Sequence, residues 1–286
     1  MVRGTSSSPW PPPPLRWVVR PPEGQMRVRR VYIKRAGGEI AGAACFTAWR
    51  GFSHLGYPLD FFEWDDLTQR CLRLDPLTLV VGGTVAVHMA LRQIGAQVPL
   101  PLNLPTSLMG FTGRRIWETT LGAVRQGFRS ESAFPLFVKP LVETKSFAGC
   151  VVAGDADLGR LQHLADDLGV QAAEPVAFVS EWRYFVHRGA VAGLAHYRGD
   201  WAVVPDSATV RRAVTAYSPA PAAYALDFGV AADGRTLVVE ANDAFALGAY
   251  GLDAVVYARM LEDRWLELVG VEGPAEPSAT ADRGGM

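Results

Sequence analysis

The sequence contains only three cysteines in 286 residues, and they lie far apart at Cys45, Cys71 and Cys150. An odd number at such spacing argues against a disulfide framework and fits a reducing compartment, so we expect a cytoplasmic protein. No apolar run reaches the roughly 18 residues of a membrane-spanning helix, so we expect no membrane association. The formal net charge is −1. The chain therefore has no overall excess of positive charge for a nucleic acid, and we expect none as a partner.

Serine, proline and arginine dominate the first 26 residues, which include four consecutive prolines at positions 11–14. Such a composition has little apolar periodicity, so we expect residues 1–26 to form a disordered tail. The small and polar stretch 271–286 predicts a second tail. The overall hydrophobic content of 49% is enough to bury a sizeable core. We expect that core to be divided between residues 27–130 and residues 131–270.

The pattern of residues 27–130 alternates between strands and helices. Residues 77–81 form an apolar run typical of a buried strand. Gly82 and Gly83 follow, and then a helical pattern ends at Gly95. This alternation predicts an α/β subdomain. The two glycines either place a phosphate at the N-terminus of the helix or simply allow a tight turn, and the sequence leaves both readings open.

Prolines and short hairpins shape the rest of the chain. Residues 99–105, PLPLNLP, predict a rigid connector, and residues 113–128 predict a helix that carries arginines. A second helix is predicted to begin at Asp155 or Asp157 and to end before Gly169. Further strands are predicted at residues 136–139, 149–152, 182–186 and 191–197.

The most informative segment is an acidic hairpin. Asp227 lies in an apolar strand, residues 232–235 form an Asp-Gly turn, and residues 237–242 form the returning strand. Because side chains alternate along a strand, Glu240 and Asn242 share a face. If the hairpin brings Asp227 beside Glu240, three oxygen ligands converge, which suits Mg²⁺ held together with phosphates. The alternative is an acidic hairpin end that is only solvated.

Asp227 followed by Glu240-x-Asn242 on the next strand resembles the metal-binding end of the ATP-grasp enzymes. The flanking sequence, DFGV–ADG–LVVEAND–LGAYGL, is similar to a divergent clade of that superfamily, the one named for its arginines and lysine. The resemblance extends over residues 134–268. It implies an α/β (α+β) ATP-grasp fold, in which an N-terminal α/β subdomain precedes two β-rich lobes that grip ATP and Mg²⁺.

The resemblance implies a pair of lysines that contact the phosphates of ATP. Lys139 ends the predicted strand 136–139, and Lys145 follows six residues later. A compact ammonium group is a good partner for phosphate oxygens, and the small residues 146–149 suit a loop that folds over the nucleotide. The alternative is a pair of exposed lysines on a turn.

The resemblance also implies a nucleotide hinge. Glu174 would meet the adenine edge and Glu181 the ribose hydroxyls, since a carboxylate accepts the two donors of a diol. Glu181 and Arg183 share a face of their strand, so Arg183 is the predicted holder of a substrate carboxylate or phosphate, with Arg198 as a second anion contact. Lys145 and Arg183 are the residues expected to act in catalysis. The alternative for Glu181 and Arg183 is a salt bridge of little energetic value.

Together these residues predict an ADP-forming, Mg²⁺- and ATP-dependent ligase that joins a carboxylate to an amine or a related nucleophile through an acyl phosphate. The resemblance makes a peptide or protein acceptor compatible with this reaction. Two alternatives remain open: a nucleotide-binding chaperone or assembly module without turnover, and an ATP-dependent kinase. No Ser-His-Asp or Cys-His set for covalent catalysis is visible in the sequence.

Overall fold

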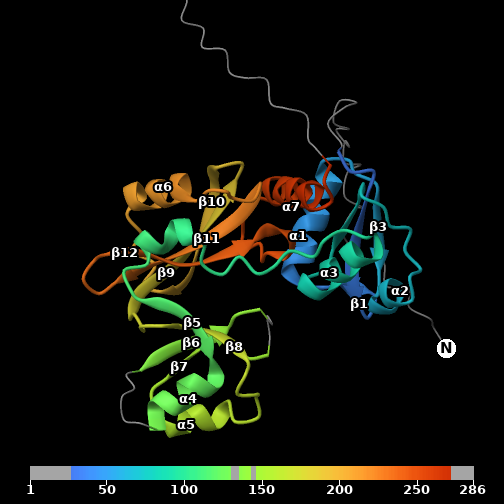
Figure 1. Cartoon of the computed structure of the whole chain (residues 1–286). Helices are drawn as coiled ribbons and strands as arrows, with labels where there is room; N and C mark the ends of the chain where they lie inside the picture. The colour runs from blue at the N-terminus through green and yellow to red at the C-terminus, as the bar shows by residue number, and fades with distance from the viewer. Residues whose placement is uncertain (1–26, 130–134, 143–145, 272–286) are drawn as a thin grey trace, which may run out of the picture.

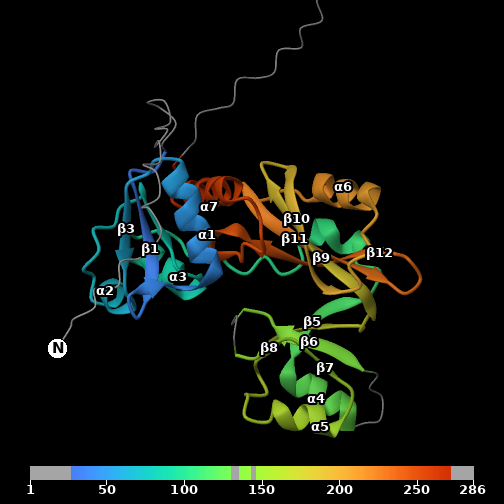
Figure 2. The ribbon, with the colours of Figure 1, turned by 180° about the vertical axis from the view of Figure 1, so that it is seen from behind.

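The computed structural model describes residues 27–129, 135–142 and 146–271. The two expected tails lie almost entirely outside these residues, and so does Lys145. The described chain forms three lobes, which are visible from both sides in Figures 1 and 2. Each lobe is built on its own four-stranded sheet. Among the described helices, none combines the length and hydropathy needed to cross a bilayer.

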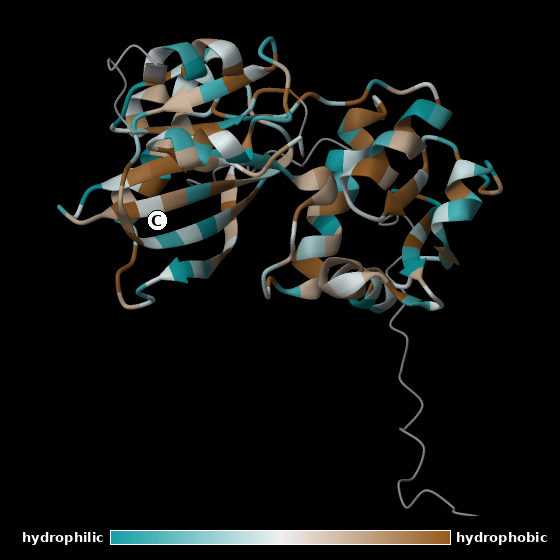
Figure 3. Ribbon diagram, turned by 90° about the horizontal axis from the view of Figure 1, so that it is seen from below, coloured by the Kyte–Doolittle hydropathy of each residue, from teal (hydrophilic) through white to brown (hydrophobic). Residues whose placement is uncertain are grey.

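The N-terminal domain confirms the expected α/β alternation. Its central strand β1 pairs in parallel with β3 and β4 and antiparallel with β2. Its elements are β1 (Arg30–Ala36), β2 (Glu39–Ile40), α1 (Gly42–His54), β3 (Leu59–Phe62), α2 (Trp64–Thr68), β4 (Thr78–Val81) and α3 (Thr84–Gln93). All four residues of β4 are buried, as its apolar run predicts. Hydrophobic residues gather on the inner strands of this domain (Figure 3).

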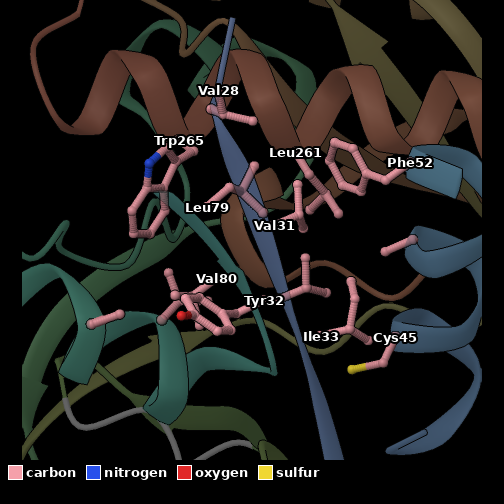
Figure 4. Packing of buried hydrophobic residues seen from close by; sticks show 14 of the residues in the cluster. Val28, Val31, Tyr32, Ile33, Cys45, Phe52, Leu79, Val80, Leu261 and Trp265 are labelled. Atoms are coloured by element: carbon pink, nitrogen blue, oxygen red, sulfur yellow. The ribbon is translucent and has the colours of Figure 1, made fainter. Parts of the chain in front are cut away.

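The C-terminal helix completes the core of the N-terminal domain. Helix α7 (Ala254–Leu268) packs against α1, and its Leu261 and Trp265 join the strand residues of the core (Figure 4). The buried carboxylate of Glu262 accepts hydrogen bonds from the backbone N–H groups of Arg27 and Val28. These contacts fasten the start of β1 to the last helix, so the chain returns to its first domain.

The small lobe is an antiparallel sheet in the order β5-β8-β6-β7, with two helices on it. Its elements are β5 (Ile116–Thr120), α4 (Leu121–Arg129), β6 (Leu136–Pro140), β7 (Cys150–Val152), α5 (Asp155–Arg160) and β8 (Gly169–Ala173). The predicted pairing of residues 136–139 with 149–152 is confirmed. Strand β5 precedes residue 131 and yet pairs within this sheet, so the division at residues 130 and 131 stays a proposal, and strand pairing favours a boundary before Ile116.

Two helix predictions in this lobe are wrong in extent. The helix expected over residues 113–128 begins only at Leu121, because β-branched and aromatic residues in 116–120 pair with β8. The helix expected up to Gly169 ends at Arg160. The carbonyls of Asp166 and Leu168 instead accept the N–H groups of Gly122 and Leu121, which are the first donors of α4.

The central lobe carries the acidic hairpin. Its antiparallel sheet has the order β10-β9-β11-β12. Its elements are η1 (Thr106–Phe111), β9 (Phe178–His187), β10 (Ala190–Gly199), α6 (Ser207–Ala216), β11 (Ala223–Ala231), β12 (Thr236–Asp243) and η2 (Ala244–Ala246). Every residue of β11 is buried, because this strand is flanked on both edges and covered by packed side chains.

Candidate functional site

The acidic hairpin brings the three predicted oxygen ligands together. Asp227 on β11 lies opposite Glu240 on β12, and a bulge follows between Asp227 and Phe228. The Asn242 amide donates to Asp227 Oδ2 and to Glu240 Oε1, each at 3.2 Å. The predicted pairing of the hairpin and the shared face of Glu240 and Asn242 are thus confirmed.

Arg183 is fixed beside the hairpin by Asp227. The guanidinium donates from Nε to Oδ1 and from Nη2 to Oδ2, each at 2.7 Å, and both side chains are buried. Burial raises the pKa of the Asp227 carboxyl, and Glu240 and Glu181 add to this rise, whereas Arg183 opposes it. Burial tends to lower the pKa of Arg183, but the hydrogen bonds to Asp227 outweigh it and raise that pKa. Arg183 therefore stays charged.

Lys139 joins the small lobe to the hairpin. It lies on β6, and its Nζ is 3.4 Å from Oε2 of Glu240 on β12. The two residues are 101 positions apart in the sequence. The ammonium thus lies directly beside the predicted metal ligands, where positive charge is favoured. Lys145, the other predicted lysine, lies outside the described residues.

Glu181 and Arg198 are brought together on neighbouring strands. Arg198 Nη1 donates to Glu181 Oε1 at 2.8 Å, and the Tyr197 hydroxyl donates to Glu181 Oε2 at 3.1 Å. Burial raises the pKa of Tyr197, and the carboxylates of Asp227 and Glu181 add to the rise. The alternative of a salt bridge between Glu181 and Arg183 is wrong, because the partners of these two residues are Arg198 and Asp227.

Glu174 lies directly after β8, between the small and central lobes. Its Oε2 accepts the backbone N–H of Arg115 at 2.9 Å, and its own N–H donates to the Arg115 carbonyl at 3.0 Å. These bonds hold the start of β5 against the end of β8. The place of Glu174 between two lobes suits a hinge, and its predicted contact with adenine stays a prediction.

A cavity of about 350 Å³ opens between the three lobes. Four of the predicted residues line it: Lys139, Arg183, Glu240 and Asn242. Asp227 lies behind Arg183 as its buried partner. Glu174, Glu181 and Arg198 do not belong to the lining of this cavity among the described residues. The cavity thus collects the two described cations and the metal ligands, but not the predicted nucleotide hinge.

Several lining residues were missed by sequence analysis. Thr84 and His88 on α3, Asn103 in the connector and Phe245 on η2 all line the cavity. The His88 ring lies 5.1 Å from the Phe245 ring. Burial and Arg92 lower the pKa of His88, while Asp243 opposes this shift. The only sequence signal near these residues was the pair of glycines before α3, because a single histidine in a helical pattern carries no sign of its role.

Tyr250 also belongs to the site. Its ring covers the Arg183 guanidinium at 4.8 Å, a distance typical of a cation–π contact. Its backbone has a φ of 45°, which is unusual for a bulky residue and is found most often at functional positions. The LGAYGL segment carried this signal only as part of the family resemblance.

The donor set fits a hard divalent cation. In the part of the chain that the structure describes, no three His, Cys, Asp or Glu side chains gather closely enough to hold a metal. The Asn242 amide is therefore needed as the third oxygen donor beside Asp227 and Glu240. The Asn242 NH₂ group now lies between the two carboxylates, in a place that favours positive charge.

Comparison with solved structures shows the fold. D-alanine–D-alanine ligase from Bacillus anthracis, complexed with ATP, is 16% identical, with a TM-score of 0.56 over 87% of this chain and 100% of that one. A RimK domain ATP-grasp protein from Sphaerobacter thermophilus is 17% identical, with a TM-score of 0.51 over 83% of this chain and 99% of that one. For N5-carboxyaminoimidazole synthetase from Staphylococcus aureus, complexed with ADP, the identity is 10% and the TM-score 0.54, over 82% and 77%.

The comparison of sequences points the same way. No curated protein matches the chain. Residues 111–260, just over half of the chain, match the ATP-grasp domain of family 2 in the clade named for its arginines and lysine. The matched segment includes the small lobe, the four strands of the central lobe and the first part of α7. The expected fold is confirmed, and the chain belongs to the ATP-grasp family, in this arginine- and lysine-named clade.

Proposed function

We propose that this protein is an ADP-forming ligase that uses Mg²⁺ and ATP to join a carboxylate to an amine or a related nucleophile through an acyl phosphate. The observation that carries the proposal is the meeting of Lys139, Arg183, Glu240 and Asn242 around one cavity. Cations and oxygen donors on the walls of one cavity are the groups that phosphoryl transfer needs, because its catalysis is mostly positioning and charge stabilisation.

Mg²⁺ bound by Asp227, Glu240 and Asn242 would neutralise charge on the phosphates of ATP. The protein's own part is to hold these donors in place. The bidentate contact with Arg183 fixes the Asp227 carboxylate, and Asn242 links it to Glu240. Such ligand orientation by neighbouring groups is typical of metal sites.

Lys139 and Arg183 have separate tasks. Lys139 ends β6 beside Glu240 and would bind a phosphate oxygen as a point charge. Asp227 occupies the Nε–Nη2 edge of Arg183, which leaves Nη1 and the second N–H of Nη2 for an anion in the cavity. We propose that this remaining edge holds the substrate carboxylate for attack on ATP. Lys145 stays a proposed phosphate contact.

Glu181, Glu174 and Arg198 are proposed to contact the nucleoside part of ATP. Glu181 already binds a hydroxyl, that of Tyr197, and its neighbour Arg198 has a largely exposed side chain. A ribose hydroxyl would take the place that the tyrosine hydroxyl shows to be favourable. The described cysteines are free, which supports the proposal of a cytoplasmic location.

Hydroxylamine tests the reaction because it traps acyl phosphates as hydroxamates. The purified chain would be incubated with ATP, Mg²⁺ and hydroxylamine together with a panel of amino acids, small carboxylic acids and short peptides. We expect at least one acid to release ADP and its hydroxamate in equal amounts. Release of AMP and pyrophosphate would contradict the mechanism, a phosphorylated hydroxyl product would favour a kinase, and nucleotide binding without any product would favour an assembly module.

A further inference from the structure

Asn103 occupies an unusual position at the wall of the cavity. It lies in the proline-rich connector between α3 and η1, and its backbone has a φ of 48°. Asparagine tolerates this left-handed conformation better than most other residues that have a side chain. Asn103 also lines the cavity that holds Lys139 and Glu240. A strained backbone at such a place indicates a function for the residue.

Asn103 binds the small lobe and the central lobe at once. Its backbone carbonyl accepts the N–H of Ala241 at 2.9 Å, and Ala241 lies between the two proposed ligands on β12. Its side-chain Nδ2 donates to the Leu141 carbonyl at 2.8 Å, two residues after Lys139. One residue thus contacts the proposed metal-binding strand through its backbone and the lysine strand through its side chain.

No strand pairing in the described chain joins β6 to β12, because the two strands belong to different sheets. Besides Asn103, the direct polar contact between them is that of Lys139 and Glu240 at 3.4 Å. That contact has to be replaced when a phosphate binds the lysine. The Asn103 bridge does not involve either charged group, so it can persist when the nucleotide is bound.

We propose that Asn103 is a positioning residue that sets the spacing between Lys139 and the proposed metal ligands Glu240 and Asn242. Its consequence for nucleotide binding rests on the proposed function. An ammonium and a metal that act on one triphosphate must keep a fixed separation, since small displacements are costly in phosphoryl transfer. Asn103 supplies the left-handed turn, the acceptor and the donor that this spacing requires.

Substitution by aspartate separates the donor from the shape. Asn103→Asp keeps the size and the tolerance of a positive φ, but it places an oxygen against the Leu141 carbonyl. Gln93 offers a matched control on α3, because its Nε2 donates to the Leu67 carbonyl at 2.7 Å. Gln93→Glu makes the same change of amide to carboxylate within the N-terminal domain, away from the cavity.

Calorimetric titration with ATP and Mg²⁺, together with the melting temperature, measures the effect. We expect Asn103→Asp to bind about tenfold more weakly than the unchanged protein, because a buried acceptor loses its donor. Gln93→Glu should lower the melting temperature by a similar amount and leave the affinity unchanged. Equal affinities for the unchanged protein and Asn103→Asp would overturn the proposal. If Asn103→Asp does not fold, Asn103→Gly tests the same donor without added charge.

Amide hydrogen exchange at Ala241 tests the bridge without any nucleotide. We expect faster exchange of this N–H in Asn103→Asp than in the unchanged protein and in Gln93→Glu, because the connector is held in place from the small lobe. Unchanged exchange at Ala241 would overturn the proposal even if Mg²⁺-ATP binding is normal. If the unchanged protein fails to bind Mg²⁺-ATP, the proposed function fails, and the exchange result alone decides the role of Asn103.

Discussion

Arg183 and Asp227 lie opposite each other on β9 and β11 and share two hydrogen bonds of 2.7 Å. Both side chains are buried, and the Tyr250 ring covers the guanidinium. This pair makes Asp227 a structural residue as well as a proposed metal ligand. The three proposed ligands should therefore differ in what their loss does to the fold.

Asp227→Ala should lower the free energy of unfolding by about 3 kcal/mol, because it leaves the buried Arg183 without its partner. Glu240→Ala should lower it by less than about 1 kcal/mol, because the Glu240 side chain is 35% exposed and its ion pair with Lys139 is correspondingly weak. Urea unfolding of the two variants at pH 7 measures the difference. Equal losses would show that the Arg183–Asp227 pair does not stabilise the fold.

Glu240→Gln should separate metal binding from folding. The amide keeps the shape of the side chain but removes the charge that attracts a hard cation. We expect the enhancement of ATP affinity by Mg²⁺ to fall by at least about tenfold, which is 1.4 kcal/mol, while the melting temperature stays the same. Calorimetric titrations with ATP alone and with ATP and Mg²⁺ provide the measurement. The metal assignment is wrong if the variant keeps the full effect of Mg²⁺.

Lys139→Met should weaken ATP binding while keeping the apolar stem of the side chain. A hydrogen bond to a charged group contributes about 1.5–3 kcal/mol, so we expect a loss of about tenfold or more in affinity. Lys34→Met is the control, because the Lys34 ammonium lies over the Trp64 ring in the N-terminal domain, 5.2 Å from its centroid. An equal effect of the two substitutions on ATP affinity would rule out the phosphate contact.

Asp263 on α7 should make stability dependent on pH. Burial alone would raise the pKa of this carboxyl, but hydrogen bonds from His187 and Arg188 and the charges of Arg27 and Arg188 hold it well below its usual range. A lowered pKa means that the stabilisation is complete above the pKa of an unfolded aspartate and is lost as the pH falls toward the folded value.

Asp263→Asn should therefore cost about 2 kcal/mol of unfolding free energy at pH 7 and much less near pH 2. Urea unfolding of both proteins across this pH range provides the test. Asp75→Asn, which removes an exposed ion pair with Arg29, serves as the control with little effect at either pH. A loss for Asp263→Asn that is the same at pH 7 and at pH 2 would contradict the assigned pKa.

The sequence was sufficient to predict the acidic hairpin, because Asp227, the Asp-Gly turn and Glu240-x-Asn242 lie within one short segment of alternating residues. It could not predict the partner of Arg183. That contact depends on β9 lying beside β11, although β10 and α6 separate the two strands in the chain. Periodicity reports which face a side chain takes, but not which strand lies next to it.

Contacts between lobes were also beyond sequence analysis. The pair Lys139 and Glu240 and the bridge made by Asn103 depend on how three sheets are arranged in space. The connector was predicted from its prolines, but the left-handed conformation of Asn103 was not. The extra length predicted for the helix at residues 113–128 has a similar cause, since pairing with β8 overrides the local helical pattern.

The transfer of oxygen from the acid to phosphate tests the proposed reaction most directly. Once hydroxylamine trapping has identified an acid, that acid is labelled with ¹⁸O in its carboxylate and turned over with ATP, Mg²⁺ and its amine. An acyl phosphate predicts ADP and inorganic phosphate that carries one ¹⁸O atom, as measured by mass spectrometry. Label in AMP, or phosphate without label, would contradict the acyl-phosphate ligase.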